Sequence, residues 1–210
     1  MRRIMLFLRD DRGSSAAEFA LILPIFLLFL LGLIDVGRFA WSFNELEKAT
    51  QIGARRAVAT DIIPGNSLAN GLANYSFATG TEQLAQGSVV PKANFPGVHC
   101  VGTATSVNCN CKSGGTCAFS TTGDATTFDK LLSRMQQIQP SIPRTGLTID
   151  YDWSGLGFAG DPNFPDVAPI VTVSVEGMQF PLLFMLGTSV ALPTSRYSMT
   201  LEDGQGTVSN

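Results

Sequence analysis

The sequence predicts an α+β protein in which a long N-terminal membrane-spanning helix continues into a small domain with a mostly antiparallel sheet. Two observations predict this fold. Residues 14–34 are apolar enough to cross a bilayer, and short segments of alternating apolar residues follow in the second half of the chain. The length of 210 residues suffices for one ordinary domain with an extension. We expect a cytoplasmic leader at 1–13, a transmembrane and stalk helix at 14–60 and an extracytoplasmic domain at 61–210.

Charge is scarce and unevenly placed. Charged residues make up 15% of the chain, below the roughly 25% of average soluble domains. The net charge of −3 provides no general basic field, so we expect no nucleic-acid partner. Four arginines stand just before the apolar stretch: Arg2, Arg3, Arg9 and Arg12.

The apolar stretch from Ser14 to Ile34 contains one charged residue, Glu18. At ~1.5 Å per residue it extends about 31 Å, enough for a hydrocarbon core of ~30 Å. Arginines before it and Asp35 after it place the N-terminus in the cytoplasm by the positive-inside tendency. We therefore predict a single-pass protein in contact with membrane lipid.

Three other interpretations compete for this stretch. A buried core helix would have a shorter uninterrupted apolar run. A secretory signal peptide would have an apolar region of about 7–15 residues before small residues at a cleavage site, and residues 33–38 show no such pattern. A plain membrane anchor without any further role stays open.

Glu18 needs an explanation, because a charge within a spanning helix costs about 2.5 kcal/mol or more at the bilayer centre and less near its edge. Gly13 lies five residues before it. A cut after Gly13 would create a charged α-amino group on Ser14, and Glu18 of a neighbouring subunit could neutralise it. In the plainer interpretation, Gly13 is a flexible joint and Glu18 reaches toward the membrane surface.

The string DDRGSSAAEF, residues 10–19, resembles the processing site of type IV-like prepilins. In that family a membrane-embedded aspartyl peptidase cuts after a glycine, and glutamate is the fifth residue of the mature chain. An aromatic residue follows at the sixth position in the tight-adherence branch. Gly13 and Ser14 match the cleaved bond, and Glu18 and Phe19 match the fifth and sixth positions.

Residues 12–59 closely resemble the TadE-like family of tight-adherence (Flp-type) pilus assembly proteins. The segments Val171–Leu183 and Leu192–Glu202 resemble the closing hairpin of that family. The residues that carry the N-terminal resemblance are Gly13, Ala17-Glu18-Phe19-Ala20, Leu23-Pro24, Gly32, Gly37-Arg38, Ala49 and Gly53-Ala54-Arg55.

The resemblance implies a minor pilin-like (pseudopilin) protein that acts in the assembly or initiation of type IV-like pili for surface attachment. It also implies the bacterial inner membrane as location, and a prepilin peptidase and other pilin-like subunits as partners. A membrane-anchored extracytoplasmic adhesin or binding module that never enters a pilus is the alternative.

Beyond Asp35 the pattern becomes amphipathic and predicts that the same helix continues to about Thr60, with an apolar stripe for the sheet. Gly32, Gly37 and Gly53 either allow close helix approach or merely add flexibility. The stripe consists of Phe39, Phe43, Leu46, Ala49 or Thr50, Gly53 and Ala57.

The domain that follows shows several shorter patterns. We expect a short helix within 73–85, a loop in the cysteine region 99–117 and an amphipathic helix at 127–138. Alternation predicts strands at 147–153 and 170–176, and we expect a last strand region at 190–201.

The four cysteines, Cys100, Cys109, Cys111 and Cys117, predict a disulfide framework in an exported domain. Cys109 and Cys111 are too close to bond easily with each other, so two pairings stay open: 100–109 with 111–117, or 100–111 with 109–117. Zinc, with His99 as a reserve ligand, and free thiols are the alternatives. The spacing lacks the closely paired cysteines of zinc knuckles.

Other polar residues form no recognisable catalytic pattern. His99 is the sole histidine and has no partner motif. Oxygen ligands for calcium are offered by Asp150, Asp152, Asp161 and Asp166, but no calcium-loop pattern surrounds them, so we interpret them as solvated carboxylates. The sequence shows no phosphate-binding loop or nucleophile elbow. We therefore expect no enzymatic activity, no cofactor and no bound metal.

Overall fold

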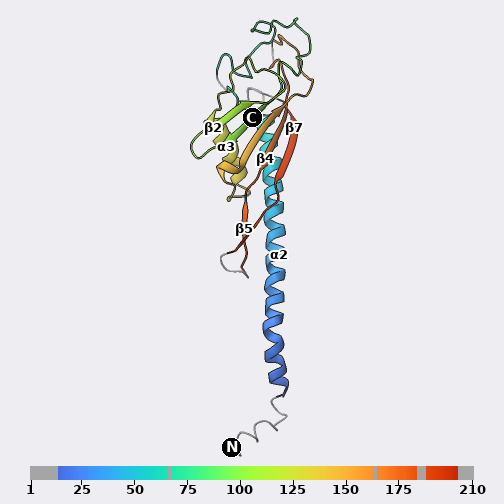
Figure 1. The fold of residues 1–210 in the computed structure, drawn as a ribbon, viewed down its shortest axis with the longest axis vertical. Helices are drawn as coiled ribbons and strands as arrows, with labels where there is room; N and C mark the ends of the chain where they lie inside the picture. Colours follow the sequence, from blue (N-terminus) through green and yellow to red (C-terminus); the bar gives the residue numbers. More distant parts are fainter. Residues whose placement is uncertain (1–13, 66–67, 163–164, 184–187, 203–210) are drawn as a thin grey trace, which may run out of the picture. The chain divides into compact units, whose positions relative to one another are not determined.

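The computed structural model describes residues 14–65, 68–162, 165–183 and 188–202. The fold is α+β, as the sequence predicts: a long helix, α2 (Ser14–Val58), precedes a five-stranded antiparallel sheet and a second helix, α3 (Ala125–Gln136) (Figure 1). The chain divides into two compact units. The first contains residues 1–41 and 180–190, and the second contains residues 42–179 and 191–210.

The helix α2 continues without a break from the apolar stretch into the amphipathic one. Pro24 lies inside it and does not end it. From Ser42 onward α2 belongs to the second unit, where one stripe is fully buried at Leu46, Ala49 and Ala54. The predicted stripe therefore faces the core. Arg55 and Arg56 occupy the last turn, where their charges interact favourably with the helix dipole.

The sheet has the strand order β2-β1-β3-β4-β7, and every neighbouring pair is antiparallel. The helix α3 follows β2 in sequence, and β3 then returns to the free side of β1. The predicted strands at 147–153 and 170–176 correspond to β3 and β4. The strand bounds are β1 (Val98–Gly102), β2 (Val107–Cys111), β3 (Leu147–Asp152), β4 (Ile170–Val175) and β7 (Ser195–Thr200).

The core of the second unit lies between the sheet and the two helices. Thr50 of α2 shares a hydrogen bond of 2.7 Å with the Ser195 hydroxyl of β7. Gly53 of α2 faces Met135 of α3 so closely that a Cβ atom there would lie 2.7 Å from the methionine sulfur. At Gly53 the glycine therefore allows the two helices to approach closely. At Gly32 and Gly37 an added Cβ would meet no atom within 4 Å, so the described structure shows no close approach there.

The predicted helix at 127–138 corresponds to α3, which begins two residues earlier and ends two residues earlier. Asp124 sets its start, because the carboxylate accepts the backbone N–H of Thr126 at 2.8 Å and caps the first turn. Phe128, Leu131 and Met135 recur on one side of the helix and are buried. This spacing is the signal that made α3 predictable.

Three local predictions are wrong. The cysteine region is not a loop: most of it forms the hairpin β1–β2, whose residues Val98, Cys100 and Gly102 point into the core. Residues 73–85 form turns without a helix. The expected strand at 190–201 is two strands, β6 (Ser189–Ala191) and β7, which Pro193 separates. Sheet pairing overrides the weak β propensity of Gly, Ser and Asn in the cysteine region.

A second group of buried residues lies in the long connections of the second unit, which gather at one end of the sheet (Figure 1). Tyr75 and Phe77 stack edge to face with ring centroids 5.0 Å apart. Phe119 contacts both rings as well as Phe95. This aromatic cluster gives the irregular connections before and after the β1–β2 hairpin a core of their own.

Tyr151 provides a direct test of the packing between the sheet and the end of α2. Its ring is fully buried, and its hydroxyl accepts the backbone N–H of Ile63 at 3.1 Å. Burial raises the pKa of this phenol well above its ordinary value of 10.0. Tyr151→Phe leaves the Ile63 N–H buried without its acceptor, which should lower the free energy of unfolding by about 1–3 kcal/mol.

The measurement is urea unfolding of the full chain in detergent micelles, followed by near-ultraviolet circular dichroism. Tyr197→Phe is the matched control, because that side chain is 38% exposed on β7. Equal stability of the two variants would contradict the assigned role of the buried hydroxyl.

Candidate functional site

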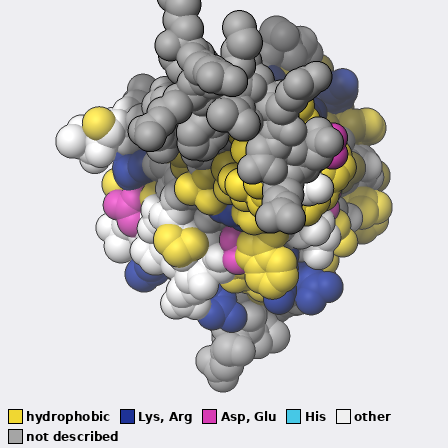
Figure 2. Space-filling view, turned by 90° about the horizontal axis from the view of Figure 1, so that it is seen from below, with side chains coloured by type: hydrophobic (Ala, Val, Ile, Leu, Met, Phe, Trp, Pro, Cys, Tyr) yellow, Lys and Arg dark blue, Asp and Glu magenta, His cyan; other side chains and the backbone are white. Residues whose placement is uncertain are grey.

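The N-terminal half of α2 is an exposed apolar surface. It belongs to the one candidate membrane span found among the described residues, and only 6% of its most apolar window is buried. Hydrophobic side chains are exposed in several places on the face that Figure 2 shows. Exposed fractions at Leu21, Ile25 and Phe29 are 75%, 69% and 64%. Exposing so large an apolar surface to water is unfavourable. This half of α2 therefore fits a single-pass membrane anchor.

The predicted processing and recognition residues fall at the start of this surface. Gly13 lies outside the described residues, and Ser14 is the first residue of α2. Glu18 and Phe19 both lie on the helix and are exposed. Glu18 is the fourth residue after Ser14, so the two positions share one helix face, one turn apart.

Asp35 marks the end of the span and has a role that the sequence did not predict. It is 5% exposed, accepts the backbone N–H of Leu183 at 3.1 Å and pairs with Arg38 at 2.9 Å. Leu183 follows the strand β5 (Gln179–Pro181), which pairs with β6 in a two-stranded sheet. A hairpin is thus attached to α2 directly after the span.

All four cysteines are in disulfides, and the structure has the first of the two pairings that the spacing left open. Cys100 and Cys109 lie opposite each other on β1 and β2 and are bonded. The second bond joins Cys111, at the end of β2, to Cys117 in the next loop. Together they fix the edge strand β2 to its neighbour and to the chain that follows.

A cluster of charged side chains occupies the face of the sheet opposite the helices. Asp150 of β3 accepts from His99 at 2.8 Å and from Lys112 at 2.7 Å, and Lys112 also contacts Asp152 at 2.7 Å. The cluster lies in a shallow depression of about 480 Å³ that extends to Arg196 on β7. Among the described residues no group of three or more His, Cys, Asp or Glu could hold a metal ion.

The charged groups of this cluster shift the pKa values of Lys112 and Asp150. Burial alone would lower the pKa of Lys112, but hydrogen bonds and charges from Asp150 and Asp152 outweigh it and raise that pKa above 10.5. Burial alone would raise the pKa of Asp150, but Lys112 and His99 hold it below 3.8. The cluster is an ion network between strands, and His99 belongs to it as the partner of a carboxylate.

Asp166 is a correction to the interpretation of the aspartates as solvated. It is 3% exposed and accepts three backbone N–H groups, from Phe77 at 2.6 Å, Gly160 at 2.8 Å and Asp161 at 3.1 Å. The carboxylate therefore holds two distant loops together. The sequence does not reveal the link to Phe77, because this backbone partner lies 89 residues away along the chain.

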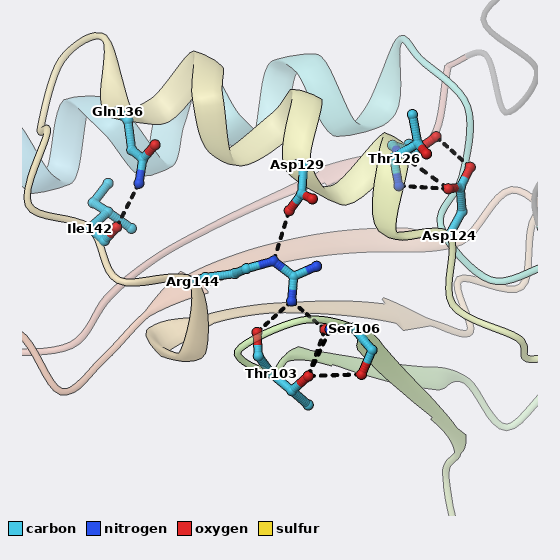
Figure 3. A network of polar contacts seen from close by, with 9 residues as sticks. Thr103, Ser106, Asp124, Thr126, Asp129, Gln136, Ile142 and Arg144 are labelled. Atoms are coloured by element: carbon cyan, nitrogen blue, oxygen red, sulfur yellow. Dashed lines mark hydrogen bonds and ion pairs between the residues drawn. The ribbon is translucent and has the colours of Figure 1, made fainter.

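Arg144 is a second structural residue that the sequence did not reveal. Its guanidinium donates to Asp129 of α3 at 2.8 Å and to the carbonyls of Thr103 and Ser106 in the β1–β2 turn. The group lies 5.2 Å above the ring of Phe128. Figure 3 shows the side chain lying between α3 and that turn, so Arg144 fixes the disulfide-bonded hairpin to the helical layer.

Comparison with known families agrees with the resemblance of the N-terminal segment. Residues 13–55 match the model of a family described as TadE-like protein. This segment covers almost all of α2, and it supports a function related to the tight-adherence pilus. Searches among curated proteins and among solved structures find no significant match.

The disulfide pairing can be tested with one substitution. In Cys109→Ser the pairing found here leaves Cys100 without a partner, whereas the other pairing leaves Cys117 free. The chain is taken from native membranes, denatured in acid to suppress exchange and alkylated without reductant. After alkylation the remaining disulfide is reduced, because Cys111–Cys117 would otherwise link the two fragments. Trypsin then cuts after Lys112, and mass spectrometry distinguishes residues 93–112 from residues 113–130.

We expect the label on the fragment 93–112. The wild-type chain, treated in the same way, should take up no label. A label on the fragment 113–130 of the variant would show the other pairing.

The ion network predicts a pH-dependent contribution to stability. Because the pKa of Asp150 is lowered on folding, its contribution is present above pH 3.8 and is lost as the pH falls through the folded value. Lys112→Gln should therefore destabilise the protein at neutral pH, and the difference from wild type should narrow below pH 3.8.

Thermal unfolding of both proteins in detergent, from neutral to acidic pH, measures this difference. Lys130→Gln, at an exposed lysine on α3, controls for the loss of one surface charge. A difference that stays constant over the whole range would show that Lys112 acts through packing of its stem rather than through its charge.

Proposed function

Because its N-terminal helix carries a TadE-like segment, we propose that this chain is a minor pilin-like (pseudopilin) subunit in the assembly or initiation of tight-adherence pili. In this proposal α2 is both the membrane anchor and the assembly helix. A prepilin peptidase removes residues 1–13, and other pilin-like subunits pack against the exposed half of α2. The observation that carries the proposal is Glu18, an acid within the exposed apolar surface of that helix.

The physical argument starts from the cost of the carboxylate. When α2 packs among other helices, Glu18 leaves water for a medium of low dielectric, where an unpaired charge is expensive. A cut after Gly13 supplies a compensating cation, the new α-amino group of Ser14. Ser14 and Glu18 are one turn apart on a single helix, so a neighbour displaced by about one turn places its amino group level with this carboxylate. Such a pair sets the axial register between subunits.

The proposed topology places the N-terminus in the cytoplasm and the second unit outside the inner membrane. The arginines before the span favour this orientation. The two disulfides are consistent with it, because such bonds persist in oxidising compartments outside the cytoplasm.

A membrane-anchored adhesin or binding module is the second candidate. The sheet of the second unit favours it, because this part of the chain lies outside the matched segment and carries an open polar depression. In that case α2 acts only as an anchor, and Glu18 has no assembly partner.

Substitution of Glu18 separates these candidates. Glu18→Ala and Glu18→Gln should both leave membrane insertion intact, because a charge is removed from an apolar run. Both should reduce co-purification with partner pilins and lower the number of pili per cell, since neither side chain can neutralise an amino group. Cleavage is measured alongside by the size of the chain in membranes. Glu47→Gln, at an exposed glutamate further along α2, should behave like wild type.

The pattern of results identifies the role of Glu18. Failure of cleavage in both variants would assign Glu18 to peptidase recognition instead of subunit pairing. Normal cleavage together with wild-type pilus numbers would contradict both roles and favour the plain anchor.

A further inference from the structure

The hairpin β5–β6 is unusual in composition for a segment attached to the outside of a helix. Between Glu176 and Arg196 the sequence contains no charged residue. Two of its described apolar side chains are largely exposed, Leu183 at 52% and Val190 at 43%. An exposed strand pair normally carries charged side chains that keep it soluble. A hairpin without charges and with exposed apolar side chains is better suited to an apolar environment.

Three contacts fix the hairpin against α2. The rings of Phe180 and Phe39 meet edge to face at 5.7 Å, and the guanidinium of Arg38 lies 5.0 Å above the ring of Phe180. The backbone N–H of Leu183 donates to Asp35. Since Asp35 is buried by this arrangement, the hairpin has a defined position on the helix.

These contacts also give the hairpin a direction. As the chain advances from Phe180 to Leu183, its partner on α2 changes from Phe39 to Asp35, which lies nearer the N-terminus of the helix. The hairpin therefore runs from its base toward the membrane span. Leu183 reaches the level of Asp35, one residue beyond Ile34, where the apolar stretch ends.

The helix presents apolar side chains at the same level. Ile34 is 51% exposed, Val36 is 67% exposed, and Trp41 is 69% exposed about one and a half turns further along. Tryptophan is enriched where a membrane meets water, because its ring is apolar and its N–H is polar. The hairpin and the helix thus expose apolar surface together at the boundary of the span.

We propose that the β5–β6 hairpin is a second membrane contact, in which the exposed side chains of Leu183 and Val190 enter the lipid at the edge of the bilayer that α2 spans. Continuity with the span identifies the occupant as lipid. In the lipid each backbone N–H needs an acceptor within the protein. Two N–H groups of the described hairpin have one: Leu182 N–H donates to the Thr188 carbonyl at 3.1 Å, and Leu183 N–H donates to Asp35. The inference rests on the membrane span of α2 and is independent of any role in a pilus.

Spin labels at three positions test this inference in the full chain reconstituted in phosphatidylcholine and phosphatidylglycerol vesicles. All four native cysteines are disulfide-bonded, so each introduced cysteine is the only free thiol. The variants are Leu183→Cys in the hairpin, Phe26→Cys in the span and Leu156→Cys in a loop of the second unit. Their native side chains are similarly exposed, at 52%, 52% and 57%. Collision rates with oxygen, which concentrates in lipid, and with a water-soluble nickel chelate report the environment of each label.

We expect oxygen to dominate at positions 26 and 183 and the nickel chelate to dominate at position 156. Val190→Cys repeats the hairpin measurement should Leu183→Cys disturb the fold, and it should also report lipid. Nickel-dominated collisions in the hairpin with lipid-like values at position 26 would overturn the proposal while leaving the anchor intact. Protection from both reagents in the hairpin would overturn it in favour of a protein partner. Water-like values at position 26 would overturn the span and the hairpin contact together.

Discussion

The structure depends on one helix that must satisfy two different environments. In its first half α2 is apolar on all sides and exposed, while in its second half one stripe is buried and the rest is polar. The change occurs at Asp35, the first acid after Glu18. A helix that is apolar all round requires lipid or other helices around it, whereas an amphipathic one requires a single packing partner. One unbroken element therefore connects a membrane surface with the core of a folded domain.

The second unit cannot be separated from this helix. Thr50 and Gly53 of α2 contact β7 and α3, and the chain just after the helix donates the Ile63 N–H to Tyr151 in the middle of the sheet. The apolar face of the sheet would be open to water without residues 42–58. A soluble form of the domain must therefore keep this part of α2 and can lose only the residues before it.

Rigidity at the periphery of the domain comes from a few polar and covalent links. Arg144 joins α3 to the β1–β2 turn, Asp166 joins two loops, and the disulfides secure the edge strand. Long connections can hold a defined shape in this way without regular secondary structure. The open polar face of this domain fits both proposed functions, a pilus-related assembly and binding at the cell surface.

Much of this architecture was predictable because it follows local periodicity. The span is recognisable from the length of its unbroken apolar run. The stripe from Leu46 onward, α3 and the strands β3 and β4 each repeat with the period of their element. The β1–β2 hairpin was missed because its Gly, Ser and Asn residues resemble a loop, and only pairing with β3 makes it part of the sheet. Asp166 and Asp35 were missed for a related reason: each accepts a backbone N–H from one residue remote in sequence, Phe77 and Leu183 respectively. For the candidate site, the residues from Gly13 to Phe19 came from a motif, while the hairpin beside Asp35 required the fold.

The central claim is that α2 is a processed pilin-type helix, and the mature N-terminus tests it most directly. The chain is recovered from the membranes of the native host and its intact mass and N-terminal sequence are determined, with Gly13→Arg as a variant that blocks the cut. We predict a chain that begins at Ser14 in the wild type and at Met1 in the variant. Recovery of wild-type chains that all begin at Met1 would contradict it.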